Sequence, residues 1–343
     1  MSDPPTLVFV PGAWHKPTCY NKITKLLQER HKLKCVAVTL PSTTGNPAAT
    51  FKDDLDAAHE AISRETSAGR DVVVVAHSYG GMVGNSAIKG FARPPPDAAN
   101  KSSSSSSPLP RASTTLAGWI GDQSQTRTAS GHVIGLILIA SGFTLTGMSF
   151  MDPFFDRPPP AWRVNKETGF ADIVTPPREL FYHDVPAEEA EYWVSQLTPQ
   201  SLKALFEGGE YSYAGWMDVP AWYIGTVEDR GLPVVAQRLS VGMAREMGAS
   251  VEHREMQTSH SPFLSQPEET VGIMLDAVEA FTGKPVEHAP TKSGRGGEII
   301  TVPAARLWQP RTWYKFGLPL VLGHILGRCY LVFRWGRGLF GSR

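Results

Sequence analysis

Three residues that together can carry out nucleophilic catalysis each follow an apolar segment of this chain. Ser78 lies in AHSYG, Asp229 in EDRGLP and His260 in TSHSPF. A histidine can take the proton of a serine hydroxyl, which then attacks a carbonyl carbon, while an aspartate holds the imidazole in the required tautomer. The order serine, acid, histidine is one that such enzymes use. These residues therefore predict a catalytic triad. Considered one at a time, each residue has another explanation: Asp229 could cap a turn and His260 could be a surface residue.

The stretch around Ser78 reads as a nucleophile elbow. Four consecutive valines, Val72–Val75, precede it and glycines follow it, which predicts a buried strand, a tight turn and then a helix. The motif is GxSxG with Ala76 at the first small position. A serine there is held in a strained conformation with its hydroxyl at the carboxyl edge of the sheet. An ordinary turn with a capping serine is the alternative.

Acyl transfer also needs two backbone N–H groups to stabilise the developing oxyanion. One comes from the residue after the nucleophile and one from an early loop beyond a strand. We assign these roles to Tyr79 and to Ala13, which lies in the turn Pro11–His15 after the expected strand Thr6–Val10. The alternative for this turn is a plain surface loop.

The elements that would position these residues alternate between strand and helix. Besides the valine run, strands are expected over residues 6–10, 34–40, 132–140, 219–224 and 250–256, and helices over 20–30, 51–68 and 234–248. This pattern predicts a doubly wound α/β fold with a mostly parallel sheet.

Two segments interrupt this domain, which we place at residues 1–283. Residues 93–130 are rich in serine and proline and are expected to be a disordered insertion. Residues 144–216 contain proline-rich loops and two helical pieces, 187–196 and 199–207, and are expected to form a cap over the site.

Aromatic residues in and near the cap are candidates for an apolar substrate pocket. They could equally form the core of the cap. The candidate pocket residues are Trp14, His15, Phe143, Phe155, Trp162 and Phe263.

The composition excludes some classes of partner. Lys plus Arg and Asp plus Glu both number 33, so no overall field attracts nucleic acid. The three cysteines are odd in number and widely spaced, which excludes a disulfide framework and a CxxC metal site. With no secretory signal at the N-terminus, we expect a cytoplasmic location.

The C-terminal part is expected to be a polar linker, residues 284–312, and an apolar and basic tail, residues 313–343. The apolar run 316–333 contains His324 and Arg328, which disfavours a clean membrane span. The two interpretations left open are an interfacial helix in peripheral contact with a membrane and a helix packed on the protein or a partner.

Together these motifs resemble the α/β-hydrolase superfamily, and within it the branch of small plant methylesterases and hydroxynitrile lyases with related microbial esterases. The resemblance covers residues 6–91 and 131–283 and rests on PGAWH, AHSYGG, YIGTVEDRGLP and TSHSPF. It favours Asp229 over the adjacent Glu228 as the acid. Two positions depart from the branch: Pro11 replaces a loop histidine, and Ser261 stands where hydroxynitrile lyases carry a lysine. The second departure argues for an esterase.

The resemblance implies a serine hydrolase that cleaves a small, largely uncharged carboxylic ester, lactone or thioester through an acyl-enzyme, without a metal or an organic cofactor. Its partner would be a small-molecule substrate. The alternatives are a small-molecule receptor or carrier that retains the triad, and cofactor-free lyase or oxygenase chemistry at the same site. No oligomeric state is predicted.

Overall fold

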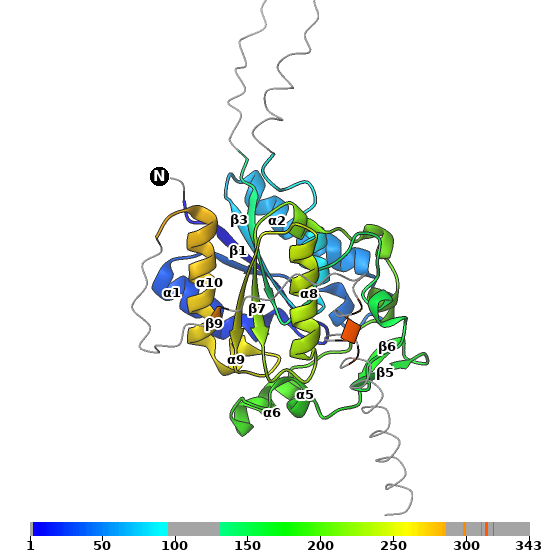
Figure 1. Cartoon of the computed structure of the whole chain (residues 1–343). Helices are drawn as coiled ribbons and strands as arrows, with labels where there is room; N and C mark the ends of the chain where they lie inside the picture. Colours follow the sequence, from blue (N-terminus) through cyan, green and yellow to red (C-terminus); the bar gives the residue numbers. More distant parts are fainter. Residues whose placement is uncertain are drawn as a thin grey trace, which may run out of the picture.

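The computed structural model of the chain describes residues 3–94, 130–285 and 298–299, with residues 310, 313, 314 and 318. In this part of the chain one sheet has the strand order β2-β1-β3-β4-β7-β8-β9 (Figure 1). Its strands are β1 (Thr6–Val10), β2 (Cys35–Ala37), β3 (Val72–His77), β4 (Val133–Ile139), β7 (Ala221–Thr226), β8 (Val251–Met256) and β9 (Glu298–Ile299). Neighbouring strands are parallel except for β8 and β9, which are antiparallel. The expected fold class is confirmed.

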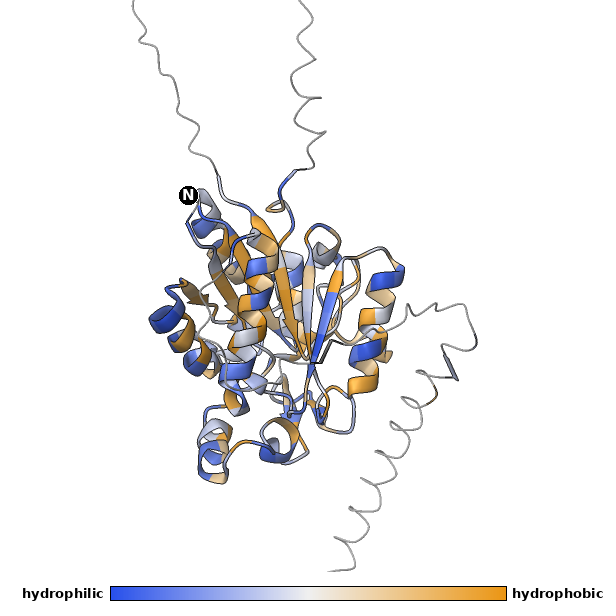
Figure 2. Ribbon diagram, turned by 60° about the vertical axis from the view of Figure 1, so that its left-hand side comes forward, coloured by the Kyte–Doolittle hydropathy of each residue, from blue (hydrophilic) through white to orange (hydrophobic). Residues whose placement is uncertain are grey.

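Helices cover both faces of the sheet (Figure 1). On one face α1 (Asn21–His31) packs against α10 (Pro267–Thr282), and α9 (Pro262–Ser265) contacts both. The other face carries α2 (Phe51–Ser67), α3 (Gly80–Ala87) and α8 (Val234–Glu246). Two apolar cores result, because successive strand residues point to opposite faces. Figure 2 accordingly shows hydrophobic central strands between helices that carry both polar and apolar residues.

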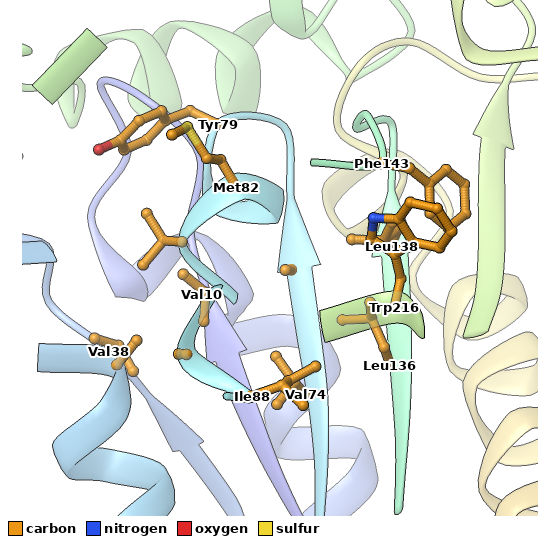
Figure 3. Close-up of a cluster of buried hydrophobic side chains, with 14 of the residues drawn as sticks. Val10, Val38, Val74, Tyr79, Met82, Ile88, Leu136, Leu138, Phe143 and Trp216 are labelled. Atoms are coloured by element: carbon orange, nitrogen blue, oxygen red, sulfur yellow. The ribbon is translucent and has the colours of Figure 1, made fainter. Parts of the chain in front are cut away.

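The core beneath the Ser78 turn joins three strands to α3. It contains Val10, Val74, Met82, Ile88, Leu136 and Leu138, with Phe143 and Trp216 beside them (Figure 3). Glycine lets α3 approach this closely: a Cβ on Gly84 would lie 2.8 Å from the Cβ of Ala76, and one on Gly80 would overlap the carbonyl oxygen of Pro11. The first turn of α3 therefore lies directly against the end of β1.

The segment between β4 and β7 includes the residues expected to form the cap, and its helices Pro177–Phe181 and Ala187–Ser195 lie beyond the carboxyl ends of the strands (Figure 1). It contains the hairpin β5 (Trp162–Asn165) and β6 (Phe170–Ile173) and the helices α5 (Pro177–Phe181), α6 (Ala187–Ser195) and α7 (Leu202–Phe206). Short 3-10 turns connect elements here and elsewhere: η1 (Pro17–Tyr20), η2 (Pro41–Thr43), η3 (Asp152–Phe154), η4 (Gly209–Tyr211) and η5 (Gly215–Met217).

The structure differs from the expected elements at several places. The strand expected over residues 34–40 is only Cys35–Ala37, because this edge strand pairs with β1 alone. The β5–β6 hairpin was not expected, since each of its strands has only four residues and includes charged or polar ones. Helices α5, α9 and α10 were not among the expected elements either.

Two expectations fall mainly on residues outside the described part: disorder of the insertion, of which residues 95–129 are not described, and an interfacial helix in the tail. The insertion leaves and re-enters the fold at one place, because Ala92 forms a bridge with Val133. None of the helices in the described residues is both long and apolar enough to cross a membrane.

Candidate active site

Ser78 is the turn residue between β3 and α3, and its backbone is strained. Its φ of 52° lies in the left-handed region that residues other than glycine rarely adopt. Its amide donates to the carbonyl oxygen of Ile139 at 3.1 Å, and its own carbonyl oxygen accepts from Ser141 Oγ at 2.7 Å. Both partners lie at the end of β4, so the neighbouring strand holds the strained turn in place.

His260 and Asp229 form a buried pair on the loops after β8 and β7. Their Nδ1 and Oδ2 atoms are 2.7 Å apart. Four further donors bind the Asp229 carboxylate: Thr226 Oγ1, Gln237 Nε2 and the amides of Gly231 and Leu232. These donors fix the carboxylate so that one oxygen faces the imidazole.

The adjacent acid, Glu228, points away from this pair. Its side chain is about half exposed, and its Oε2 lies 3.7 Å from Nε2 of His183. The carboxylate that reaches His260 is therefore that of Asp229.

His77, the residue before Ser78, links the serine turn to the histidine loop. Its Nε2 lies 2.9 Å from the carbonyl oxygen of His260, and because a carbonyl only accepts, Nε2 carries the proton. The two rings are 4.6 Å apart. Burial, with the nearby imidazoles of His260 and His15, lowers the pKa of His77 well below its usual value. His77 is therefore neutral, and its Nε2–H donates to the loop that carries His260.

The turn that carries Ala13 touches the serine turn. A Cβ on Gly12 would lie 3.0 Å from the Cβ of Ser78, so only glycine permits this approach. Among the described residues, no hydrogen bond uses the amide N–H of Ala13 or of Tyr79. Both N–H groups are therefore unpaired in this part of the chain.

A buried carboxylate anchors the side chain of Tyr79. The Tyr79 hydroxyl donates to Oδ2 of Asp54 at 2.7 Å, and the amide of Ser42 donates to Oδ1 at 2.8 Å. Asp54 is fully buried, and burial raises its pKa to about 6. The sequence analysis missed this residue, although its spacing from Phe51 and Ala58 puts an acid on the apolar face of α2.

The candidate pocket residues occupy several places. Trp14 and Trp162 come together with their ring centroids 5.9 Å apart, and Trp14 also lies 6.1 Å from Phe181. Phe263 is buried behind the site, 5.0 Å from the ring of His77.

The other three candidates differ in their surroundings. Phe143 is buried against Trp216 and Tyr223. Phe155 is 86% exposed on a surface turn and is not brought to the site. His15 is buried, with Nδ1 2.7 Å from the carbonyl oxygen of Ala13.

This arrangement has the parts needed for acyl transfer: a strained serine, a histidine oriented by a carboxylate, and unused amides beside the serine. In the described ranges, no group of three or more His, Cys, Asp and Glu side chains is placed to hold a metal ion.

Residues 7–273 match the family model described as the alpha/beta hydrolase family, and the chain belongs to that family. The family expected from the sequence is thereby confirmed. A relative from Aspergillus novofumigatus, described as the alpha/beta hydrolase nvfD, is 26% identical over 278 residues, which cover 80% of this chain and 96% of the relative.

Solved structures share the fold. Polyneuridine aldehyde esterase has a TM-score of 0.55 at 19% identity, with 80% of this chain and 99% of that chain covered. A pyrethroid hydrolase from Sphingobium faniae has a TM-score of 0.57 at 18% identity, with 82% and 99% covered. A methylesterase from Arabidopsis has a TM-score of 0.51 at 20% identity, with 80% and 99% covered.

Proposed function

We propose that this chain hydrolyses small, largely uncharged carboxylic esters, lactones or thioesters through an acyl-enzyme on Ser78. The observation that carries the proposal is the 2.7 Å contact between His260 Nδ1 and Asp229 Oδ2, in loops at the same sheet edge as the strained turn of Ser78. The names of two structures with this fold, an esterase and a pyrethroid hydrolase, are consistent with it.

In the first half of the reaction, Nε2 of His260 accepts the proton of Ser78 Oγ as this oxygen bonds to the carbonyl carbon. Asp229 stabilises the imidazolium that forms. The amides of Ala13 and Tyr79 donate to the oxyanion of the tetrahedral intermediate. The intermediate then collapses, and the leaving alcohol takes the proton from His260.

In the second half, water attacks the acyl-enzyme and gives its proton to His260. The bond from Ser78 Oγ to the acyl carbon breaks, the acid departs, and the serine regains its proton. Activity should fall on acidification, because a protonated imidazole cannot act as the base.

The charge state of the site supports an uncharged substrate. His15 and His77 lie near His260, and burial lowers the pKa of His15 to about 4 and that of His77 well below its usual value. Both are neutral at neutral pH, so neither supplies a positive charge for an anionic acyl group.

The test is covalent labelling combined with turnover. A fluorophosphonate probe should label Ser78, as located by peptide mass spectrometry, and Ser78→Ala should abolish labelling. His260→Ala should strongly reduce it, because the base is lost. Ser63→Ala, on the outer part of α2, is the matched control and should label like the wild type.

Release of a chromogenic alcohol from aryl esters should show a burst followed by steady turnover. Labelling without turnover on any ester, lactone or thioester would indicate a receptor or carrier instead. Absence of labelling in folded protein would remove the triad assignment.

A further inference from the structure

The cap segment Phe181–Asp184, here called the clamp, is bonded to the loop that carries His260. Oδ2 of Asp184 accepts from Thr258 Oγ1 at 2.7 Å and from the Ser259 amide at 2.9 Å. The carbonyl oxygen of Phe181 accepts from Ser259 Oγ at 2.9 Å. Burial raises the pKa of Asp184, but the hydrogen bonds from Ser259 and Thr258 outweigh it, so the pKa lies below its usual value. The clamp therefore binds the histidine loop as an anion.

The same clamp is bonded to the turn that carries Ala13. His15 Nδ1 lies 2.7 Å from the carbonyl oxygen of Ala13, and His15 Nε2 lies 2.7 Å from the hydroxyl of Tyr182. The carbonyl can only accept, so Nδ1 carries the proton. Because His15 is neutral, with its pKa lowered to about 4 by burial, Nε2 accepts from Tyr182. A chain of two hydrogen bonds thus runs from the cap to Ala13.

Two further bonds from the cap hold the residue between Ala13 and His15. Trp14 Nε1 donates to the carbonyl oxygen of Ala171 at 2.9 Å, and the amide of Thr198 donates to the carbonyl oxygen of Trp14 at 2.9 Å. Trp14 has a φ of 62°, in the left-handed region. A tryptophan keeps that conformation only when its surroundings impose it.

We propose that Tyr182 and His15 are positioning residues that aim the Ala13 amide at the substrate oxyanion. This inference rests on the proposed function. The Ala13 N–H shares a peptide plane with the carbonyl of Gly12, and that carbonyl oxygen accepts from the amide of His15 at 3.3 Å. Because bonds from the cap hold His15 and Trp14, the peptide plane that carries the Ala13 N–H is held with them. The cap would then contribute to transition-state stabilisation as well as covering the substrate, because an oxyanion donor acts only when its position is fixed.

Tyr182→Phe tests the proposal, because it removes one hydroxyl and keeps the ring. On a chromogenic ester we expect kcat to fall about tenfold with little change in KM, a fraction of the roughly 10²–10³-fold effect of losing a whole oxyanion donor. The affinity for a trifluoromethyl ketone, which forms a tetrahedral adduct with the serine, should fall by a similar factor. Tyr213→Phe is the matched control: it removes a hydroxyl that donates to an exposed acid, Asp218, at 2.8 Å. It should change neither quantity.

A second pair of variants applies if Tyr182→Phe does not fold. His15→Asn can place an N–H close to the position of Nδ1 and should retain more kcat than His15→Leu, which has no donor. A purely structural role would lower Tm in both without this difference in kcat.

Unchanged kcat and ketone affinity in Tyr182→Phe would overturn the proposal, as would equal kcat in the two His15 variants. These outcomes differ from failure of the proposed function, in which the wild type itself would show no hydrolysis that depends on Ser78.

Discussion

Oδ2 of Asp229 lies 2.7 Å from Nδ1 of His260, while the adjacent acid, Glu228, points to His183 instead. Asp229→Asn should lower kcat on the order of ten-thousand-fold, by analogy with serine proteases, because an amide can hold the imidazole in the wrong tautomer. Glu228→Gln should leave kcat nearly unchanged. Steady-state hydrolysis of an aryl ester by the two variants checks this. The reverse result would assign the acid to Glu228.

The close approach of α3 to β1 makes Gly80 a sensitive position. Gly80→Ala should abolish most activity and lower Tm, because the added Cβ would overlap the backbone of Pro11 and displace the turn that carries Ala13. Gly272→Ala in α10 is the control, since no atom lies within 4 Å of its added Cβ. It should stabilise the protein by about 0.5–1 kcal/mol. Thermal melts and ester hydrolysis measure Tm and activity for both variants. Unchanged Tm and activity in Gly80→Ala would contradict the packing argument.

The insertion should be dispensable for folding and activity. Ala92 and Val133 form a bridge, and the amide of Val133 donates to the carbonyl oxygen of Phe91 at 2.9 Å, so a short link can span the gap. We expect replacement of residues 95–129 by a few Gly and Ser residues to leave Tm and kcat/KM nearly unchanged, because loop length adds little closure entropy. Insoluble or unfolded protein would refute this.

The free energy of unfolding should fall on mild acidification, because three buried histidines have lowered pKa values. Burial lowers the pKa of His15 and His253 from 6.5 to about 4, and that of His77 well below 6.5. Between pH 6 and 5 the unfolded chain therefore takes up protons that the folded protein does not. Asp54 acts in the opposite sense, because burial raises its pKa from 3.8 to about 6, so the folded protein holds its proton in this range.

The net difference is about two protons, which corresponds to a loss of roughly 3 kcal/mol of unfolding free energy per pH unit. Urea unfolding at several pH values measures this slope. His253→Leu should reduce the slope by about one proton, because it removes one of the three buried imidazoles. The Nε2 of His253 lies 3.5 Å from Oε1 of Glu255, and neither ring nitrogen makes a hydrogen bond in the described structure, so the change breaks none. A slope unchanged in this variant would contradict the assignment.

The buried strands were predictable because their sequences are distinctive. The strands β3 and β4 are runs of valine, isoleucine and leucine, which only a sheet covered on both faces accommodates. The β5–β6 hairpin has no such signal. Its pairing depends on the turn at Gly169, with a φ of 77°, and on contacts with the rest of the cap.

The positions of Ser78, Asp229 and His260 were predictable for a similar reason, since the carboxyl ends of parallel strands share one edge of the sheet. The supporting residues were not. Tyr182 meets His15 across 167 residues of sequence, and Tyr79 meets Asp54 across 25. Such partners depend on how the cap and α2 pack, and no local sequence pattern predicts that packing.

The strand order of the sheet has a consequence for protein synthesis. On the side of β1 opposite β2, the strands β3, β4, β7 and β8 are added in chain order, so a nascent chain can extend the sheet at that edge without reopening it. Asp229 and His260 leave the ribosome after most of the domain, and α10, which packs on α1 near the start of the chain, follows them. Ser78, the proposed nucleophile, is therefore translated long before His260, its proposed base, and the growing polypeptide cannot assemble the proposed triad until synthesis of the domain is almost complete.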